Sequence, residues 1–260
     1  MLTLLSPAKT LDFDFSIDGL PTTEPDFQEE IQVLLQRCKQ LGVASLEELM
    51  ALSQSLAELN HQRFQDMSLP FTPENSKPCV LAFRGDVYRG LDAASLSKEN
   101  LQWAQGQLRI LSGLYGLLRP LDLIQPYRLE MGTRLDTKRG RNLYDFWGTQ
   151  ITDALNAEYA KRPASAVLNL ASNEYFRSVR SDRLRAPLIT ALFQEIRDGK
   201  PRTISFSAKR ARGLMARFIV LERIETPDGL KDFAEEGYTY RSELSQEDRL
   251  LFVRKQDWAD

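Results

Sequence analysis

The chain has 260 residues, of which 42% are hydrophobic and 27% charged, and its formal net charge is −2 at pH 7. These proportions are ordinary for a globular protein and exclude an intrinsically disordered chain. No apolar run approaches the length of a membrane-spanning helix, and the amino terminus lacks the features of a signal peptide, so we expect a cytoplasmic protein with no membrane partner. Cys38 and Cys79 are far apart in sequence, which excludes a disulfide framework or a zinc module.

Positive charge is concentrated in the middle of the sequence. Residues 101–220 contain 20 Lys and Arg against 10 Asp and Glu, whereas residues 1–100 contain 8 against 15 and residues 221–260 contain 6 against 11. A basic segment between two acidic ones attracts anions even when the total charge is near zero. The alternative is an ordinary solvated surface whose charges pair across the fold.

The first elements expected along the chain are a strand and a helix. The apolar run Leu2–Leu5 predicts a buried strand, followed by a loop at residues 6–10. Apolar residues then recur at helical spacing over residues 27–41. We expect a helix there, with Asp26 as its N-cap and Gly42 at its end.

Helices and a strand are expected between residues 45 and 106. A capping box at residues 45–48 opens one helix, and Ser53 caps a second that extends to about residue 67. A loop at residues 68–78 contains three prolines. Residues 79–83 predict a buried strand, and Ser97 caps a helix to about residue 106.

The second half mixes further strands with helices. Long helices are expected over residues 143–162 and 208–224. Strands are expected at residues 166–170, 187–196, 202–206, 238–240 and 250–253. This mixture predicts one α/β or α+β domain over residues 1–260, with a mixed sheet surrounded by helices. The spacing of the strands is too irregular to define a doubly wound topology.

Several familiar catalytic and binding motifs are absent from the sequence. His61 is the single histidine, and it lies in an expected helix with no acidic residue or cysteine at motif spacing. We therefore do not expect a zinc hydrolase site, and most kinds of Ser-His triad are disfavoured. A Walker loop and a dinucleotide-binding glycine fingerprint are also missing, so no cofactor is expected. Iron sites favour His, Cys and grouped carboxylates, so a dedicated iron site is not expected either.

Three polar loops each follow an expected apolar strand. The first contains Lys9, the second contains Asn173 and Glu174, and the third leads into a helix that carries four basic residues, namely Lys209, Arg210, Arg212 and Arg217. The ends of strands are where α/β proteins commonly bind ligands, and free N–H groups at a helix start attract anions. A shared polar cleft is one interpretation, in which Asp86, Glu130 and Glu174 orient basic groups or transfer protons. Simple capping and solvation of helices is the other.

Residues 108–123 contain Gly113 and Gly116 between apolar residues. Such a segment can form a tight hairpin between short helices, in which the glycines let backbone N–H groups approach a phosphate. A helix-hairpin-helix usually has glycines two residues apart, however, whereas these are three apart. Pro120 also delays the start of a second helix. A plain structural turn is therefore the alternative.

Seven segments carry distinctive motifs that follow one another in a fixed order along the chain. They include Ser-Pro-Ala-Lys-Thr-Leu-Asp at residues 6–12 and Asn-Leu-Ala-Ser-Asn-Glu-Tyr-Phe at residues 169–176. The others are residues 83–90, 111–122, 125–132, 143–148 and 208–218. Together these segments resemble the YaaA peroxide-stress family, from Met1 to about Val253. The resemblance is highly specific, because seven long motifs in one order do not arise by chance.

The resemblance implies a cytoplasmic protein of the hydrogen peroxide response that is associated with lower free iron and with protection of DNA from oxidative damage. It also implies a single compact domain with a positively charged cleft, a helix-hairpin-helix-like element and binding of double-stranded DNA. It assigns no catalytic residue.

Two functions follow as hypotheses. The first is binding of double-stranded DNA with little sequence preference, and the second is an enzyme acting on a nucleotide, nucleobase or other phosphorylated small molecule. The expected phosphate contacts are Lys9, Arg84, Gly113, Gly116, Arg119, Arg128, Asn173, Lys209, Arg210, Arg212 and Arg217. Candidates for catalysis are Lys9, Glu130, Glu174 and Lys209. No metal ligand is proposed.

Overall fold

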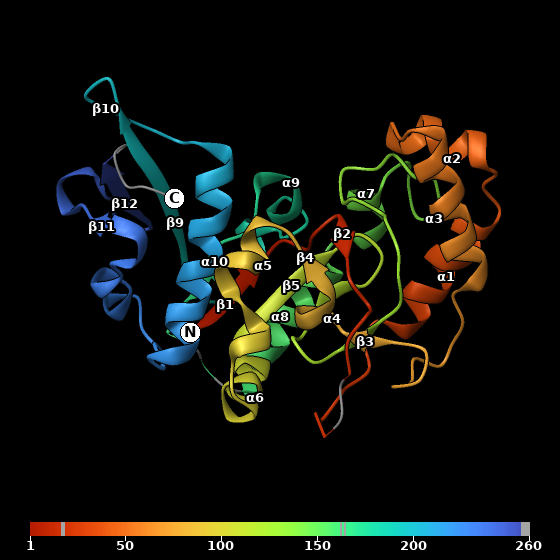
Figure 1. The fold of residues 1–260 in the computed structure, drawn as a ribbon, viewed down its shortest axis with the longest axis horizontal. Helices are drawn as coiled ribbons and strands as arrows, with labels where there is room; N and C mark the ends of the chain where they lie inside the picture. The colour runs from red at the N-terminus through yellow and green to blue at the C-terminus, as the bar shows by residue number, and fades with distance from the viewer. Residues whose placement is uncertain (17–18, 162, 164, 256–260) are drawn as a thin grey trace.

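The computed structural model describes residues 1–16, 19–161, 163 and 165–255, and an eight-stranded sheet runs through this part of the chain (Figure 1). Its centre consists of parallel strands, namely β1 (Leu2–Leu5), β5 (Leu108–Ser112), β8 (Val167–Asn169), β9 (Leu188–Arg197) and β12 (Arg249–Lys255). Antiparallel strands β6 (Gly116–Leu118), β10 (Lys200–Arg202) and β11 (Thr239–Tyr240) pair with β5, β9 and β12 respectively. The prediction of a mixed α/β sheet is confirmed.

Strand β1 is the point at which the order of the parallel strands reverses. All four of its residues are buried, as expected for a strand with neighbours on both edges and layers on both faces. The next parallel strand along the chain, β5, lies on one side of β1, whereas β8, β9 and β12 follow on the other side. In open α/β sheets, ligands bind outside the carboxyl ends of the strands at such a switch point.

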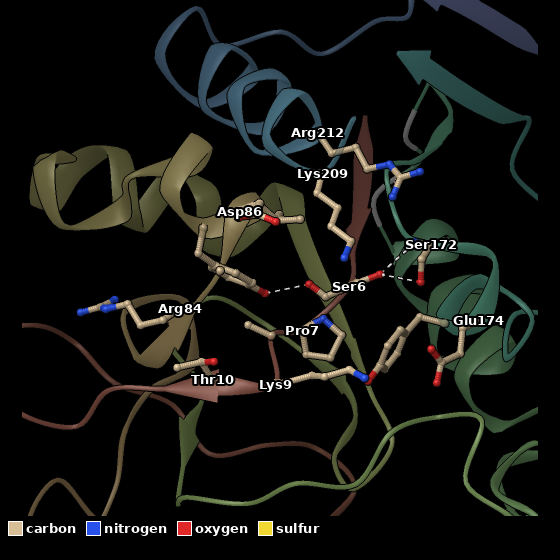
Figure 2. Close-up of a pocket in the computed structure, with 15 residues that line it drawn as sticks. Ser6, Pro7, Lys9, Thr10, Arg84, Asp86, Ser172, Glu174, Lys209 and Arg212 are labelled. Carbon is tan, nitrogen blue, oxygen red and sulfur yellow. Dashed lines mark hydrogen bonds between the residues drawn. The ribbon is translucent and has the colours of Figure 1, made fainter. Parts of the chain in front are cut away.

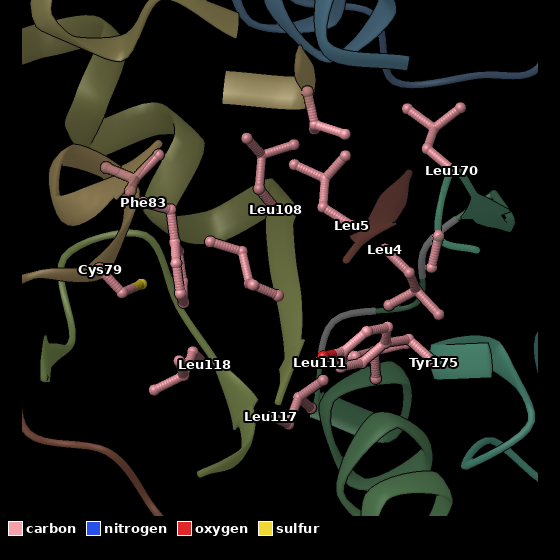
Figure 3. Packing of buried hydrophobic residues seen from close by; sticks show 14 of the residues in the cluster. Leu4, Leu5, Cys79, Phe83, Leu108, Leu111, Leu117, Leu118, Leu170 and Tyr175 are labelled. Carbon is pink, nitrogen blue, oxygen red and sulfur yellow. The ribbon is translucent and has the colours of Figure 1, made fainter. Parts of the chain in front are cut away.

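Helices cover both faces of the sheet. Helices α5 (Asp86–Leu91), α6 (Lys98–Gln107) and α10 (Ser205–Leu221) lie on one face, and α8 (Gln150–Lys161) lies on the other (Figure 1). Ser97 caps α6 as expected, because its Oγ accepts a hydrogen bond from the Asn100 N–H at 3.1 Å. Figure 3 shows the core at the centre of the sheet, where Leu5, Leu108 and Leu111 are almost completely buried.

Glycines allow an unusually close contact between α5 and α10. A Cβ atom at Gly213 would lie 1.8 Å from the Val87 carbonyl oxygen, and one at Gly90 would lie 2.3 Å from the Arg210 carbonyl oxygen. No side chain fits at either position, so the two backbones touch directly. This contact fixes the position of α10 relative to the start of α5.

Three helices form a separate group at one end of the molecule (Figure 1), namely α1 (Gln28–Lys39), α2 (Val43–Met50) and α3 (Gln54–Asp66). Ser53 caps α3 as predicted, accepting from the Leu56 N–H at 3.4 Å. Two expected caps are wrong. Phe27 rather than Asp26 stands at the N-cap of α1, and α2 begins at Val43, two residues before the expected capping box.

Three expected elements in the rest of the chain are also wrong. Residues 79–83 are buried but form one helical turn, α4 (Cys79–Ala82), because a short apolar run does not distinguish a strand from a buried turn. The expected helix 143–162 is divided into α7 (Leu143–Trp147) and α8 at Gly148, whose φ is +51°, and its last residue, Arg162, lies outside the described residues. Residues 202–206 are not a strand, since β10 ends at Arg202 and α10 begins at Ser205.

The expected helix-hairpin-helix does not form. Residues 108–118 instead form an antiparallel hairpin of the central sheet, in which Ser112 pairs with Gly116. Both glycines allow close packing: a Cβ at Gly113 would lie 2.3 Å from the Leu129 carbonyl oxygen, and a Cβ at Gly116 would lie 2.6 Å from the Trp147 ring. Close packing in the buried hairpin therefore accounts for glycine at both positions, and contact with phosphate is not needed to explain them.

The remaining elements are short. Strands β2 (Thr10–Leu11) and β4 (Phe83–Arg84) pair with each other, as do β3 (Lys77–Pro78) and β7 (Leu123–Ile124). Helix α9 (Asn173–Phe176) follows β8, and the 3₁₀ helices are η1 (Ala93–Ser95), η2 (Ser181–Arg183), η3 (Asp228–Asp232), η4 (Glu235–Gly237) and η5 (Ser242–Leu244). None of the helices in the described part of the chain is both long and apolar enough to span a membrane.

Candidate functional site

A pocket of about 430 Å³ opens at the carboxyl end of the sheet, beside the switch point at β1. Its walls come from the loop after β1, the turn between β4 and α5, the loop after β8 and the first turns of α10 (Figure 2). Its polar side chains are Ser6, Lys9, Thr10, Arg84, Asp86, Tyr88, Ser172, Glu174, Tyr175, Lys209 and Arg212. Because β1 and β8 are parallel neighbours, their loops meet at this edge.

Hydroxyl groups tie the loops together at the base of the pocket. The backbone N–H of Ser172 donates to the Ser6 Oγ at 2.8 Å, and the Ser6 Oγ lies 3.3 Å from the Ser172 Oγ. The buried Tyr88 hydroxyl donates to the Ser6 carbonyl at 2.9 Å. These bonds hold two serine hydroxyls in a fixed position under α10.

Two cations from α10 face these hydroxyls. Lys209 and Arg212 lie on the same side of the helix, and both line the pocket. The Lys209 side chain points down toward Ser6, whereas the Arg212 side chain extends sideways, toward the side of the pocket where Ser172 lies (Figure 2). Among residues 1–16, 19–161, 163 and 165–255, neither side chain has an ion pair or hydrogen bond. Burial lowers the pKa of Arg212, but a guanidinium stays charged at neutral pH. Within that part of the chain, the pocket therefore holds two positive charges that have no ion-pair partner.

The other two cations of the pocket have partners within the protein. The Lys9 Nζ lies 2.9 Å from the Glu130 carboxylate, which also binds Arg128 at 3.0 Å. The Arg84 Nη2 donates to Asp12 at 2.9 Å, and its Nη1 donates to a backbone carbonyl at 2.7 Å. Lys9, Arg84 and Arg128 are thus each paired with a carboxylate, and their positive charges attract a ligand less strongly than those of Lys209 and Arg212 do.

Two carboxylates complete the walls. Glu174 is exposed, and its Oε1 accepts from the Gly132 N–H at 3.0 Å. Asp86 lies 3.7 Å from Arg89, a long ion pair with a mostly exposed arginine. The aromatic ring of Tyr175 forms part of the wall, and burial raises the pKa of its hydroxyl.

Three more of the expected phosphate contacts are committed to bonds elsewhere. Arg119 pairs with Asp122 at 3.0 Å and Asp26 at 3.1 Å. Arg210 donates to Glu236 at 2.7 Å. The Arg217 Nη1 donates to the backbone carbonyls of residues 91 and 92, at 3.1 and 3.0 Å. Each of these three arginines therefore has a role in holding the fold together. Asn173, the exposed first residue of α9, does not line the pocket.

Comparison with known proteins agrees with the resemblance seen in the motifs. Residues 1–244 match the family described as peroxide stress protein YaaA. The chain belongs to this family. It is 52% identical over 257 residues to a UPF0246 protein of Burkholderia mallei, covering 98% of this chain and 99% of the relative. It is 50% identical over 256 residues to a UPF0246 protein of Saccharophagus degradans, covering 98% and 100%.

The pocket of this YaaA-family protein contains two tyrosines that the sequence analysis did not select, and two serines that belong to the predicted polar loops. Tyr88 and Tyr175 form walls of the pocket, and Ser6 and Ser172 fix its base. All four lie within segments that carry the family resemblance, so these motifs were the feature of the sequence from which the four residues could have been selected. No group of three or more His, Cys, Asp or Glu side chains suited to a metal ion occurs in the described parts of the chain.

Proposed function

We propose that this protein binds a small phosphorylated molecule in the pocket, with the phosphate between α10 and the serine hydroxyls. The observation that carries the proposal is the pair Lys209 and Arg212, which face the pocket without a neutralising group among the described residues. Guanidinium groups bind phosphate through two parallel hydrogen bonds, and an ammonium group adds a point charge. The Ser6 Oγ donates its hydrogen to the Ser172 Oγ, so the Ser172 hydroxyl keeps its own hydrogen as a further donor.

The dimensions of the pocket also favour a small ligand. Its volume of about 430 Å³ lies within the range of small-molecule sites, roughly 300–1,000 Å³. It is too small to receive a DNA duplex. The two-sided supply of donors, from α10 above and from the serine loops below, is characteristic of a site that encloses one group. An enzymatic role follows if Glu174 or Lys9 then acts on the bound molecule.

A thermal-shift experiment tests this proposal. Inorganic phosphate or ribose 5-phosphate should raise the melting temperature of the wild-type protein, because a ligand that binds only the folded state stabilises it. Arg212→Met and Lys209→Met should lose most of that rise. Lys200→Met removes an exposed cation outside the pocket and serves as the matched control. The proposal fails if neither probe stabilises the wild type, or if Arg212→Met responds as the control does.

Binding of double-stranded DNA is a second proposal, favoured by a different surface. The β9–β10 hairpin projects from the body of the molecule (Figure 1), and both Lys200 and Arg202 on it are exposed. No acidic residue occurs between residues 199 and 221. Exposed cations of this kind bind the phosphate backbone without reading sequence. Coating of DNA in this way would limit iron-dependent oxidative damage, as the family resemblance implies.

Titration of a labelled duplex at two salt concentrations tests the DNA proposal. Counterion release predicts that affinity falls steeply with salt, and Lys200→Glu with Arg202→Glu should weaken binding to all sequences about equally. Nicking of plasmid by Fe²⁺ and hydrogen peroxide should decrease in the presence of the wild type but not of the double variant. Absent or salt-insensitive binding removes this proposal and leaves the pocket proposal untouched.

A further inference from the structure

We infer that the pocket selects a phosphomonoester, meaning a single terminal phosphate on a molecule rich in hydroxyl or amino groups, over polyphosphates and phosphodiesters. This inference rests on the proposed phosphate site and adds the chemical class of its ligand. It follows from how charge is distributed over the walls of the pocket.

The uncompensated positive charge is confined to one wall. Lys209 and Arg212 lie on the α10 side, above Ser6 and Ser172, whereas Glu174 lies on the α9 side and Asp86 at the start of α5 (Figure 2). A phosphate group held by α10 would therefore have carboxylates around the remainder of the ligand. The pocket offers one site for an anion and not a continuous basic channel.

The charge of a phosphomonoester matches this arrangement. Such a group carries about −1.5 to −2 charges at pH 7 and three terminal oxygens that accept hydrogen bonds. Lys209 and Arg212 together supply two positive charges. A phosphodiester carries a single charge and has substituents on two sides, so it presents fewer oxygens to the same donors.

Among the described residues that line the pocket, the other two cations already have carboxylate partners, so a second phosphate would find no unpaired cation. Lys9 is held by Glu130 at 2.9 Å, and Arg84 is held by Asp12 at 2.9 Å. A diphosphate or triphosphate would instead bring its additional negative charge toward Glu174 or Asp86. Repulsion between like charges in a partly desolvated pocket disfavours such ligands.

The carboxylates favour donor groups on the remainder of the ligand. One oxygen of Glu174 accepts from the Gly132 N–H at 3.0 Å, which holds the carboxylate in place beside the pocket. An ionised carboxylate accepts several hydrogen bonds, so Glu174 retains capacity for a hydroxyl or amine. A sugar phosphate or a nucleoside monophosphate carries both the phosphate and the hydroxyls that this arrangement requires.

Calorimetric titration with matched probes tests the selectivity. Ribose 5-phosphate should bind the wild-type protein at least tenfold more tightly than a ribonucleoside triphosphate or a dinucleoside phosphodiester. Glu174→Gln should weaken ribose 5-phosphate and strengthen the triphosphate, because it removes an acceptor and a repulsive charge together. Glu247→Gln changes an exposed carboxylate outside the pocket and should leave both affinities unchanged.

The possible outcomes distinguish the selectivity for phosphomonoesters from the phosphate site itself. If all phosphate probes bind equally and all depend on Arg212, the phosphate site stands and the selectivity is wrong. If Glu174→Gln moves both affinities in the same direction, the role assigned to its charge is wrong. If no probe binds, or if binding does not depend on Arg212, the phosphate site itself fails.

Discussion

Replacing Glu195 by glutamine disturbs the buried ion network that joins the sheet to α10. Glu195 lies on β9 and is only 2% exposed. It binds Arg254 of β12 at 2.8 Å and Arg197 at 2.7 Å. Arg254 lies 3.5 Å from Glu236, to which Arg210 of α10 donates at 2.7 Å. The substitution therefore leaves the buried Arg254 guanidinium with only its longer ion pair to Glu236, at 3.5 Å.

The size of the effect follows from the pKa of Glu195. Burial raises this pKa, but hydrogen bonds from Ser207, Arg254 and Arg197 outweigh it and lower the pKa to about 2, from an ordinary value of 4.5. The difference corresponds to about 3 kcal/mol of folding free energy at neutral pH. Because the pKa is lowered by folding, this stabilisation is complete above pH 4.5 and is lost as the pH falls toward 2. Breaking one partner of a buried pair typically costs a similar amount, about 3–5 kcal/mol.

Urea unfolding followed by tryptophan fluorescence measures this loss. At pH 7 we expect Glu195→Gln to lower the free energy of unfolding by about 3 kcal/mol, and we expect the difference from wild type to shrink below pH 4.5. Glu243→Gln, which breaks an exposed pair with Arg241 at 3.9 Å, is the control and should cost less than about 0.5 kcal/mol. A loss below about 1 kcal/mol at pH 7, or one that is unchanged at pH 3, would refute this reasoning.

Three further predictions concern the packing around the pocket and the thiols. Gly213→Ala should destabilise the protein by about 3 kcal/mol in calorimetric melting, and it should weaken ribose 5-phosphate binding because it separates α10 from α5. The control Gly42→Ala, which adds a Cβ in open space, should be nearly neutral in the same measurement. Tyr88→Phe should cost about 1 kcal/mol by leaving the Ser6 carbonyl unpaired, as urea unfolding would report. Burial raises the pKa of the Cys38 thiol to about 12 and also raises the pKa of the Cys79 thiol well above its ordinary value, so neither thiol should react with a thiol reagent before unfolding. Fast labelling of the native protein would contradict this.

The elements that the sequence predicted correctly are those with local signals. The strands at Leu2–Leu5 and Val167–Asn169 follow from continuous apolar runs, and the caps at Ser53 and Ser97 follow from short-range hydrogen bonding. The polar loops at the ends of these strands could be selected for the same reason. Their meeting at one pocket depends on β1 and β8 being neighbours, which no local pattern specifies.

The parts that were wrong depend on distant contacts. Gly113 and Gly116 suggested a phosphate-binding hairpin, but Gly113 instead makes room for the Leu129 backbone and Gly116 for the Trp147 ring, both of which come from later parts of the chain. Likewise, the basic residues Arg210 and Arg217 look equivalent to Arg212 in the sequence. Their partners come from other elements: Arg210 donates to the Glu236 carboxylate, and Arg217 donates to the Asp92 backbone carbonyl. The sequence alone does not reveal which cations remain free for a ligand.

In the proposed site, Arg212 binds the phosphate group of a small ligand. Charge-assisted hydrogen bonds are worth about 1.5–3 kcal/mol, which corresponds to an affinity change of roughly 10- to 150-fold. Calorimetric titration of ribose 5-phosphate into wild type, Arg212→Met and Lys200→Met measures this directly. We predict equal affinity for wild type and Lys200→Met, and at least a tenfold loss for Arg212→Met. Equal affinity of all three proteins for ribose 5-phosphate would contradict the claim.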